Sequence, residues 1–198
     1  MSAVVIAGNT SGSVTLSAPD VAGTTTLTLP ATTATIATNV NGNLYPLTSG
    51  TSVTASGTSV TFTGIPSWVK RITVMFSGVS TNGTSHLLIQ LGAGSVTTSG
   101  YNVYGVNFGG AGLSGAGYTN GYAIRNGSAS DLYSGSLNVN NLNGVSWAGQ
   151  GMFASSASSN GFGTSGSITL GGALDRVRIT TVNGTDTFDA GSINILYE

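Results

Sequence analysis

The stretch LDRVRITTVNGTDTFDAGSINILYE, residues 174–198, decides the fold class of this chain. Near its start, Val177 and Ile179 alternate with two arginines, so apolar side chains point to one side and charged side chains to the other. A similar alternation recurs near its end, in Ile193, Ile195 and Tyr197. This period of two is that of a β-strand with one buried face. The turn-forming pair Asn183-Gly184 lies between these segments, so the stretch predicts two strands joined as a terminal hairpin.

The same signals extend over the rest of the chain. Seven Asn-Gly dipeptides separate short segments rich in Val, Ile, Thr, Tyr and Phe, and no helical period runs longer than two turns. Leu87, Ile89 and Leu91 share one face of another alternating segment, and the apolar run of residues 68–76 predicts a central strand. Strands separated by turns at this spacing predict an all-β fold, specifically a β-sandwich of the jelly-roll kind.

The chain carries very few charges. Of its 198 residues, five are Lys or Arg and six are Asp or Glu, whereas about one quarter of a typical soluble domain is charged. Five scattered basic residues cannot form the electrostatic surface that nucleic acids require. The apolar runs are far shorter than the roughly 20 residues of a membrane-spanning helix. A surface so poor in charge tends to associate, so we expect a homo-oligomer or a subunit of a larger assembly.

The composition changes near residue 47. Residues 1–43 contain a single charge, Asp20, and no aromatic residue. We therefore expect two parts, an extended β arm over residues 1–47 and a β-sandwich domain over residues 48–198. An arm of this size cannot build a core by itself, and its Thr-rich strands suit pairing with the sheet edge of another protein. The arm is therefore expected to anchor the chain in an assembly.

Three stretches carry a resemblance to known proteins. They are SGSVTLSAPDVAGTTTLTLPATTATIAT (residues 11–38), VTFTGIPSWVKRITVMFSGVSTNGTS (residues 60–85) and residues 174–198 quoted above. These segments resemble sequence that recurs in tail-fibre-like virion proteins of tailed bacteriophages. The resemblance implies a β-rich, usually trimeric protein of the virion surface, made in the host cytoplasm. Because fibres, head fibres and capsid decorations all bear such segments, it implies the setting rather than the task.

Aromatic residues in the middle of the chain stand among Asn, Gly and Ser. Aromatic rings beside amide groups can bind sugars, by stacking on apolar sugar faces and by hydrogen bonds to hydroxyls. The same rings also suit a protein core or a subunit interface, and the sequence leaves both interpretations open. The residues considered for glycan contact are Tyr101, Tyr104, Tyr118, Tyr122 and Trp147.

Charged residues gather towards the C-terminus. Arg176 and Arg178 share the outward face of one strand, where they are either solvated or paired with acidic residues of a neighbouring subunit. Asp186 and Asp189 are the acidic candidates for such intersubunit ion pairs. Their carboxylates could also hold Ca²⁺, although Asp is equally a turn former. With one His and no Cys in the chain, we assign no metal site.

Catalytic chemistry finds little support in the sequence. The pattern G-x-G-x-x-G occurs at residues 110–115, but no helix-forming segment or acidic partner follows, so a flexible loop is expected rather than a nucleotide site. His86 is the only imidazole, and its neighbour Ser85 would point to the opposite face of a strand, which disfavours a catalytic triad. We expect a non-enzymatic protein without a cofactor.

Two functions of different classes fit these observations. The first is a homotrimer that decorates and stabilises a phage capsid, as a cement or head-fibre protein, with its arm bound to the major capsid protein or another virion protein. The second is a tail-fibre tip that recognises a host surface glycan. The length favours the first, because a tail fibre normally adds a docking domain and a long shaft. Neither involves nucleic acid or membrane insertion.

Overall fold

A computed structural model describes residues 3–7, 11, 13–17, 24, 46–109, 112–125, 127–155 and 157–198. The chain divides into two units, Met1–Asn43 and Leu44–Glu198. In the first unit, β1 (Ala3–Ala7) and β2 (Ser13–Ser17) form an antiparallel pair. Most of the arm expected over residues 1–47 lies outside the described residues, so its anchoring role stays a prediction.

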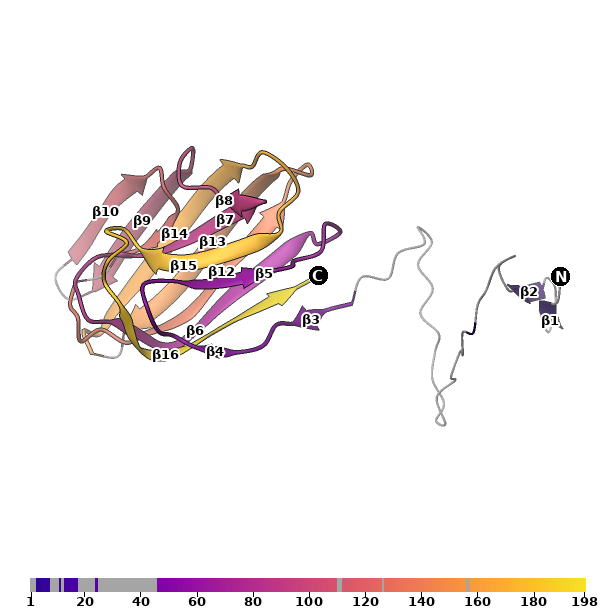
Figure 1. Cartoon of the computed structure of the whole chain (residues 1–198), viewed down its shortest axis with the longest axis horizontal. Helices are drawn as coiled ribbons and strands as arrows, with labels where there is room; N and C mark the ends of the chain where they lie inside the picture. The colour runs from indigo at the N-terminus through magenta and orange to yellow at the C-terminus, as the bar shows by residue number, and fades with distance from the viewer. Residues whose placement is uncertain are drawn as a thin grey trace. The chain divides into compact units, whose positions relative to one another are not determined.

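The second unit consists of two antiparallel sheets, drawn one in front of the other in Figure 1. The described residues contain no helix, and hence none that could cross a membrane. The large sheet has the order β10-β9-β14-β13-β12-β6-β16-β3, with β4 also paired to β16. Its strands are β3 (Thr48–Ser49), β4 (Val53–Thr54), β6 (Arg71–Thr81), β9 (Asn102–Gly109), β10 (Gly112–Tyr118), β12 (Tyr133–Asn141), β13 (Ser146–Ser155), β14 (Asn160–Thr169) and β16 (Phe188–Tyr197).

The small sheet has the order β11-β7-β15-β5, with β8 also paired to β7. Its strands are β5 (Val60–Thr63), β7 (Leu87–Ala93), β8 (Ser95–Val96), β11 (Tyr122–Ile124) and β15 (Arg176–Thr181). Two antiparallel sheets around one core form a β-sandwich, so the prediction of an all-β sandwich is confirmed.

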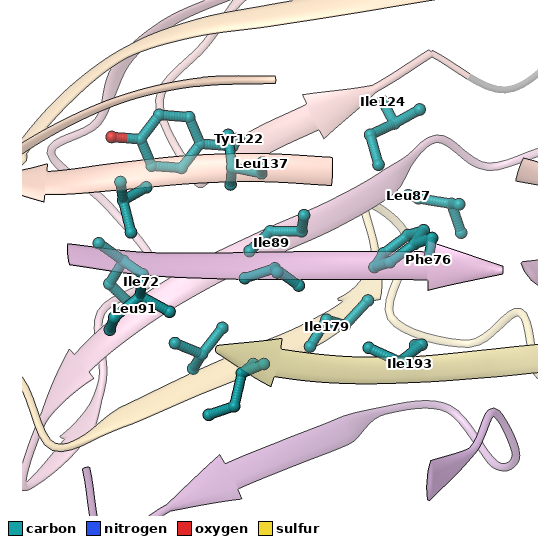
Figure 2. Packing of buried hydrophobic residues seen from close by; sticks show 14 of the residues in the cluster. Ile72, Phe76, Leu87, Ile89, Leu91, Tyr122, Ile124, Leu137, Ile179 and Ile193 are labelled. Carbon is teal, nitrogen blue, oxygen red and sulfur yellow. The ribbon is translucent and has the colours of Figure 1, made fainter. Parts of the chain in front are cut away.

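The core lies between the two sheets. In β15, Val177 and Ile179 are fully buried, as the alternation of the sequence predicts. In β12, Leu137 and Val139 are buried while Asn140 is exposed. Figure 2 shows the packing of residues from both sheets: Ile72, Phe76, Leu137 and Ile193 from the large sheet, and Leu87, Ile89, Leu91, Tyr122, Ile124 and Ile179 from the small sheet. Each large apolar side chain so buried contributes about 1.5–3 kcal/mol, and this shared core joins the sheets.

The terminal hairpin predicted for residues 174–198 is wrong. Strand β15 pairs with β5 and β7, whereas β16 pairs with β6, so the segment around Asn183-Gly184 crosses from the small sheet to the large one. Gly184 does have the positive φ, +70°, that this dipeptide favours. A positive φ turns the chain sharply, but it does not decide whether the flanking strands pair. The pair Asn143-Gly144, by contrast, lies between the adjacent strands β12 and β13.

Two other segments were also predicted from the sequence. The apolar run of residues 68–76 contributes to β6, which begins at Arg71 and lies between β12 and β16, as expected of a central strand. The loop predicted for residues 110–115 is wrong from Gly112 onward, because these residues belong to β10 and pair with β9. Glycine weakens a strand but does not prevent one when a neighbour supplies the hydrogen bonds. Residues 110 and 111 lie outside the described residues.

Candidate functional site

The outward side of the large sheet has an unusual chemistry. Five consecutive strands, β10, β9, β14, β13 and β12, contain no Asp, Glu, Lys, Arg or His. The strand register aligns outward side chains in rows across them. One row runs through Asn138, Gln150, Ser165 and Tyr104. We call the outward side of these five strands the neutral face, because a typical soluble surface is about 25–35% charged.

The neutral face also carries exposed hydrophobic side chains. Tyr104, Phe108, Leu113 and Met152 account for four of the eight large hydrophobic residues that are exposed in the described part of the chain. Leu113 lies directly opposite Phe108 in the register. The ring of Tyr104 lies over Gly115, where a Cβ would be only 2.5 Å from a ring carbon. Exposed apolar surface that gathers on one face is typical of an interaction site.

A groove of about 500 Å³ lies on the neutral face. Its lining residues include Tyr104, Val106, Asn138, Gln150, Met152 and Ser165. The Thr73 hydroxyl donates to Asn138 Oδ1 at 2.6 Å, which leaves the Asn138 amide nitrogen as a donor for other groups. A second hollow of about 200 Å³ shares Gln150 and Ser165 with the groove. One aromatic ring, one thioether and several amide and hydroxyl groups therefore line adjoining depressions.

Three of the aromatic residues considered for glycan contact lie in the core. Tyr101, Tyr122 and Trp147 are each at most 3% exposed, so their side chains are not available to a ligand at the surface. The Tyr101 hydroxyl accepts a hydrogen bond from the Leu91 backbone N–H at 2.7 Å, and its ring meets that of Tyr122 edge-on at 5.9 Å. Burial raises the pKa of Tyr101 to about 12 and also raises that of Tyr122. For these three residues the structure supports the core interpretation.

The other two aromatic candidates, Tyr104 and Tyr118, differ in their surroundings. Tyr118 is half-buried, and its ring lies 6.0 Å from that of His86. Its hydroxyl accepts a long hydrogen bond, 3.4 Å, from Arg125. Tyr104 is 56% exposed and lines the groove. Of the five predicted glycan-contact residues, Tyr104 alone lines this groove, because the others face the core or the edge of the sandwich.

The two arginines of β15 have different partners in their own chain. Arg176 forms a bidentate pair with Asp175, through Nε–Oδ1 at 2.8 Å and Nη2–Oδ2 at 3.0 Å. The hydrogen bond from Arg176 holds the pKa of Asp175 below its ordinary value. Arg178 instead donates Nε–H and Nη2–H to Gln90 Oε1, at 2.9 and 2.6 Å. The predicted intersubunit pairs thus stay a prediction, and each guanidinium has a partner within the chain.

Asp186 and Asp189 belong to separate hydrogen-bond networks. Asp186 accepts hydrogen bonds from the Ser85 backbone N–H at 2.9 Å and from Asn183 Nδ2 at 2.6 Å. Asp189 accepts a short hydrogen bond from the Ser80 hydroxyl. Within the described residues, no three His, Cys, Asp or Glu side chains gather in a way that could hold a metal ion. Each of the two carboxylates therefore has hydrogen-bond partners of its own within the chain.

Sequence reasoning missed two glutamines. Gln90 is 3% exposed and lies directly opposite Arg178 in the register between β7 and β15, although 88 positions separate them. Gln150 lies at the centre of the neutral face, in both the groove and the second hollow. No signal in the sequence could have found the first, because only strand register brings these residues together. Gln150 could have been noted as an amide that alternates with small residues in a strand.

Comparisons with known proteins add no relative: no family model matches the chain, and no curated protein or solved structure matches it. The class of protein is thus given by its architecture alone, which is a two-sheet β-sandwich with a neutral outward face.

Proposed function

We propose that the chain is a non-enzymatic structural protein of a phage virion, which decorates and stabilises the capsid as a homotrimer anchored by its N-terminal arm. The setting rests on the sequence resemblance of residues 11–38, 60–85 and 174–198 to tail-fibre-like virion proteins. The single structural observation that carries the proposal is the neutral face, which has no charged strand residue yet exposes Tyr104 and Met152.

Covering such a face by another protein costs little desolvation of charge. Burying an ionised side chain is expensive unless it is paired, whereas hydroxyl and amide groups can exchange water for partners across an interface. The neutral face also offers exposed apolar side chains, whose burial favours association. Both properties suit assembly between copies of the chain or with a neighbouring virion protein.

The assembly test compares two variants, each of which adds one charge to one outward side of the sandwich. Gln150→Lys puts an ammonium at the centre of the neutral face, and the matched control Thr63→Lys puts one on the exposed outward side of β5 in the small sheet. We expect light scattering to show a trimer for the native protein and the control, and smaller species for Gln150→Lys. A monomeric native protein, or a Gln150→Lys variant that stays trimeric, would contradict assembly through this face.

The anchoring role is tested on particles. Phage carrying a version of the protein without residues 1–43 should lose most of its decoration, measured as copies per capsid by quantitative mass spectrometry. Occupancy equal to that of the native protein would show that the arm does not anchor it.

The groove supports a second candidate, a receptor-binding tip that recognises a host surface glycan. The observation in its favour is the exposed Tyr104 ring beside Gln150 and Asn138, a combination able to stack on and hydrogen-bond to a neutral sugar. Under this function, Tyr104→Ala weakens adsorption of phage to cells while capsid occupancy and oligomeric state stay unchanged. Under the first function, adsorption does not change.

A further inference from the structure

Another polar depression lies on the small sheet, on the opposite side of the sandwich from the neutral face. It has a volume of about 300 Å³. Its floor comes from β7 and β15 and contains Gln90 and Arg178. Around them stand Thr58, Ser59, Thr98 and Asn120. We call this depression the Arg178 hollow.

Arg178 is hydrogen-bonded to a neutral side chain, Gln90, whereas Arg176 is paired with the carboxylate of Asp175. The two ion pairs among the described residues are Arg71–Glu198 and Arg176–Asp175. Arg178 is half-buried, and in the part of the chain that the structure describes its guanidinium donates hydrogen bonds to one group, the amide oxygen of Gln90. A partly desolvated cation without a counter-charge is unfavourable on its own. A bound anion would supply the missing charge.

Gln90 fixes the orientation of this cation. Its Nε2 donates to the backbone carbonyl of Asn120 at 2.7 Å, so its Oε1 must be the atom that faces Arg178. The amide is 3% exposed and held at both ends. Oε1 occupies one N–H on Nε and one on Nη2 of the guanidinium. Of the five N–H groups of an arginine, three are left without an acceptor among the described residues.

We propose that the Arg178 hollow binds the carboxylate of an acidic sugar, a uronic or sialic acid unit of a surface glycan. A carboxylate matches the forked donor geometry of a guanidinium and forms charge-assisted hydrogen bonds with it. The rim supplies groups that can hydrogen-bond to a pyranose ring, namely the exposed hydroxyls of Thr58, Ser59 and Thr98. A volume of about 300 Å³ lies at the lower end of small-molecule sites, as suits one sugar unit.

This site is independent of the function proposed above. It lies on the small sheet, whereas the assembly proposal rests on the neutral face of the large sheet. Binding at Arg178 can therefore fail while assembly holds, and the reverse.

The test is a titration of the labelled full-length protein with D-glucuronate, N-acetylneuraminate, D-glucose and acetate at constant ionic strength, followed by NMR. We expect each acidic sugar to shift the Arg178 Nε–H and Gln90 side-chain signals with saturation. Glucose should leave them unchanged, and acetate should bind at least tenfold more weakly than the sugars. Equal affinity for glucose and glucuronate would overturn the role of the guanidinium. Equal affinity for acetate would mean an adventitious ion only.

Three variants assign the binding to Arg178. Arg178→Gln should weaken glucuronate binding at least tenfold, while the matched control Arg176→Gln, two residues away on the same face, should stay within about twofold of the native protein. Gln90→Glu, which gives Arg178 an internal carboxylate, should also weaken binding at least tenfold with Arg178 still present. Native-like affinity in Arg178→Gln would overturn the proposal. If a variant fails to fold, the ligand series on the native protein still decides it.

Discussion

The two outward sides of this sandwich enclose the same core but differ in composition. The five strands of the neutral face contain eleven glycines and no charged residue. The small sheet contains one strand glycine, Gly92, and two arginines, Arg176 and Arg178. Both sheets present alternate residues to one set of buried side chains. The shared core does not explain why one sheet carries two arginines on its outward side while these five strands of the other carry no charge.

The largest expected effect comes from a substitution in the core, because both sheets depend on it. Phe162 is 1% exposed, and its ring meets Tyr133 edge-on at 5.2 Å. Phe162→Ala removes this ring and leaves a cavity, so we expect a loss of about 3–5 kcal/mol in the free energy of unfolding. Urea denaturation measures it.

Met152, on the strand next to Phe162, is the matched control. It is a large side chain that points outward and is 59% exposed. Met152→Ala should change the free energy of unfolding by less than about 0.5 kcal/mol, even though it trims the neutral face. A large loss of unfolding free energy in Met152→Ala would show that the side chains of the neutral face are needed for folding. The outward sides of the two sheets could then not be compared as surfaces independent of the core.

The second effect concerns the glycines of the large sheet. Gly135 has a φ of +147°, and a Cβ there would lie 2.2 Å from the Met152 carbonyl oxygen and 2.8 Å from Phe153 Cα. Because the clash is with backbone, Gly135→Ala should cost about 2–3 kcal/mol. The control is Gly171→Ala, where a Cβ would meet nothing within 4 Å. Equal thermal midpoints for the two variants would contradict a steric need for glycine in β12.

A third, smaller effect concerns Asp131, a buried charge that lies next to β12. It is 2% exposed and accepts hydrogen bonds from the Ser155 hydroxyl at 2.7 Å and the Tyr133 hydroxyl at 3.2 Å. Burial alone would raise the pKa of Asp131, but hydrogen bonds led by that from Ser155 lower it below the ordinary value. Asp131→Asn should cost about 1–2 kcal/mol at pH 7, because a charge-assisted acceptor is lost.

The pH dependence of this prediction has a definite sign. Because the pKa of Asp131 is lower in the folded state, its contribution to stability is present above the ordinary carboxyl pKa. It is lost as the pH falls through the folded-state pKa. The difference in unfolding free energy between native protein and Asp131→Asn should therefore shrink in acid. A difference that grows below pH 4 would contradict the assigned direction.

Much of the sandwich could be predicted from the sequence, but not which aromatic residues lie inside it. In β15 the alternation is decisive, because Val177 and Ile179 oppose two arginines. In β9 both faces are apolar: Val103 points inward, while Tyr104 and Val106 line the outward groove. The alternation of residues along a strand does not show which of two apolar faces is buried. The sequence therefore could not identify Tyr104 as the exposed ring. The pairing of residues far apart in sequence is likewise fixed by strand register, which local patterns do not encode.

The smallest expected effect is on the small sheet, whose outward side carries Arg176 and Arg178. Arg176→Gln removes a partly exposed ion pair with Asp175, and such pairs contribute little because water still solvates both charges. Asp175 keeps hydrogen bonds from the Gly94 backbone N–H at 3.2 Å. We therefore expect Arg176→Gln to change the free energy of unfolding at pH 7 by less than Phe162→Ala, Gly135→Ala or Asp131→Asn does.

The same substitution should nevertheless move one titration. The hydrogen bond from Arg176 is the main cause that lowers the pKa of Asp175, so Arg176→Gln should raise that pKa towards its ordinary value, measured by carboxyl-carbon NMR. Because a lowered pKa stabilises the fold above the ordinary carboxyl pKa and ceases to do so as pH falls through the folded-state value, the variant should lose part of the acid dependence of stability. An unchanged Asp175 titration would show that the pair between Arg176 and Asp175 does not persist in solution.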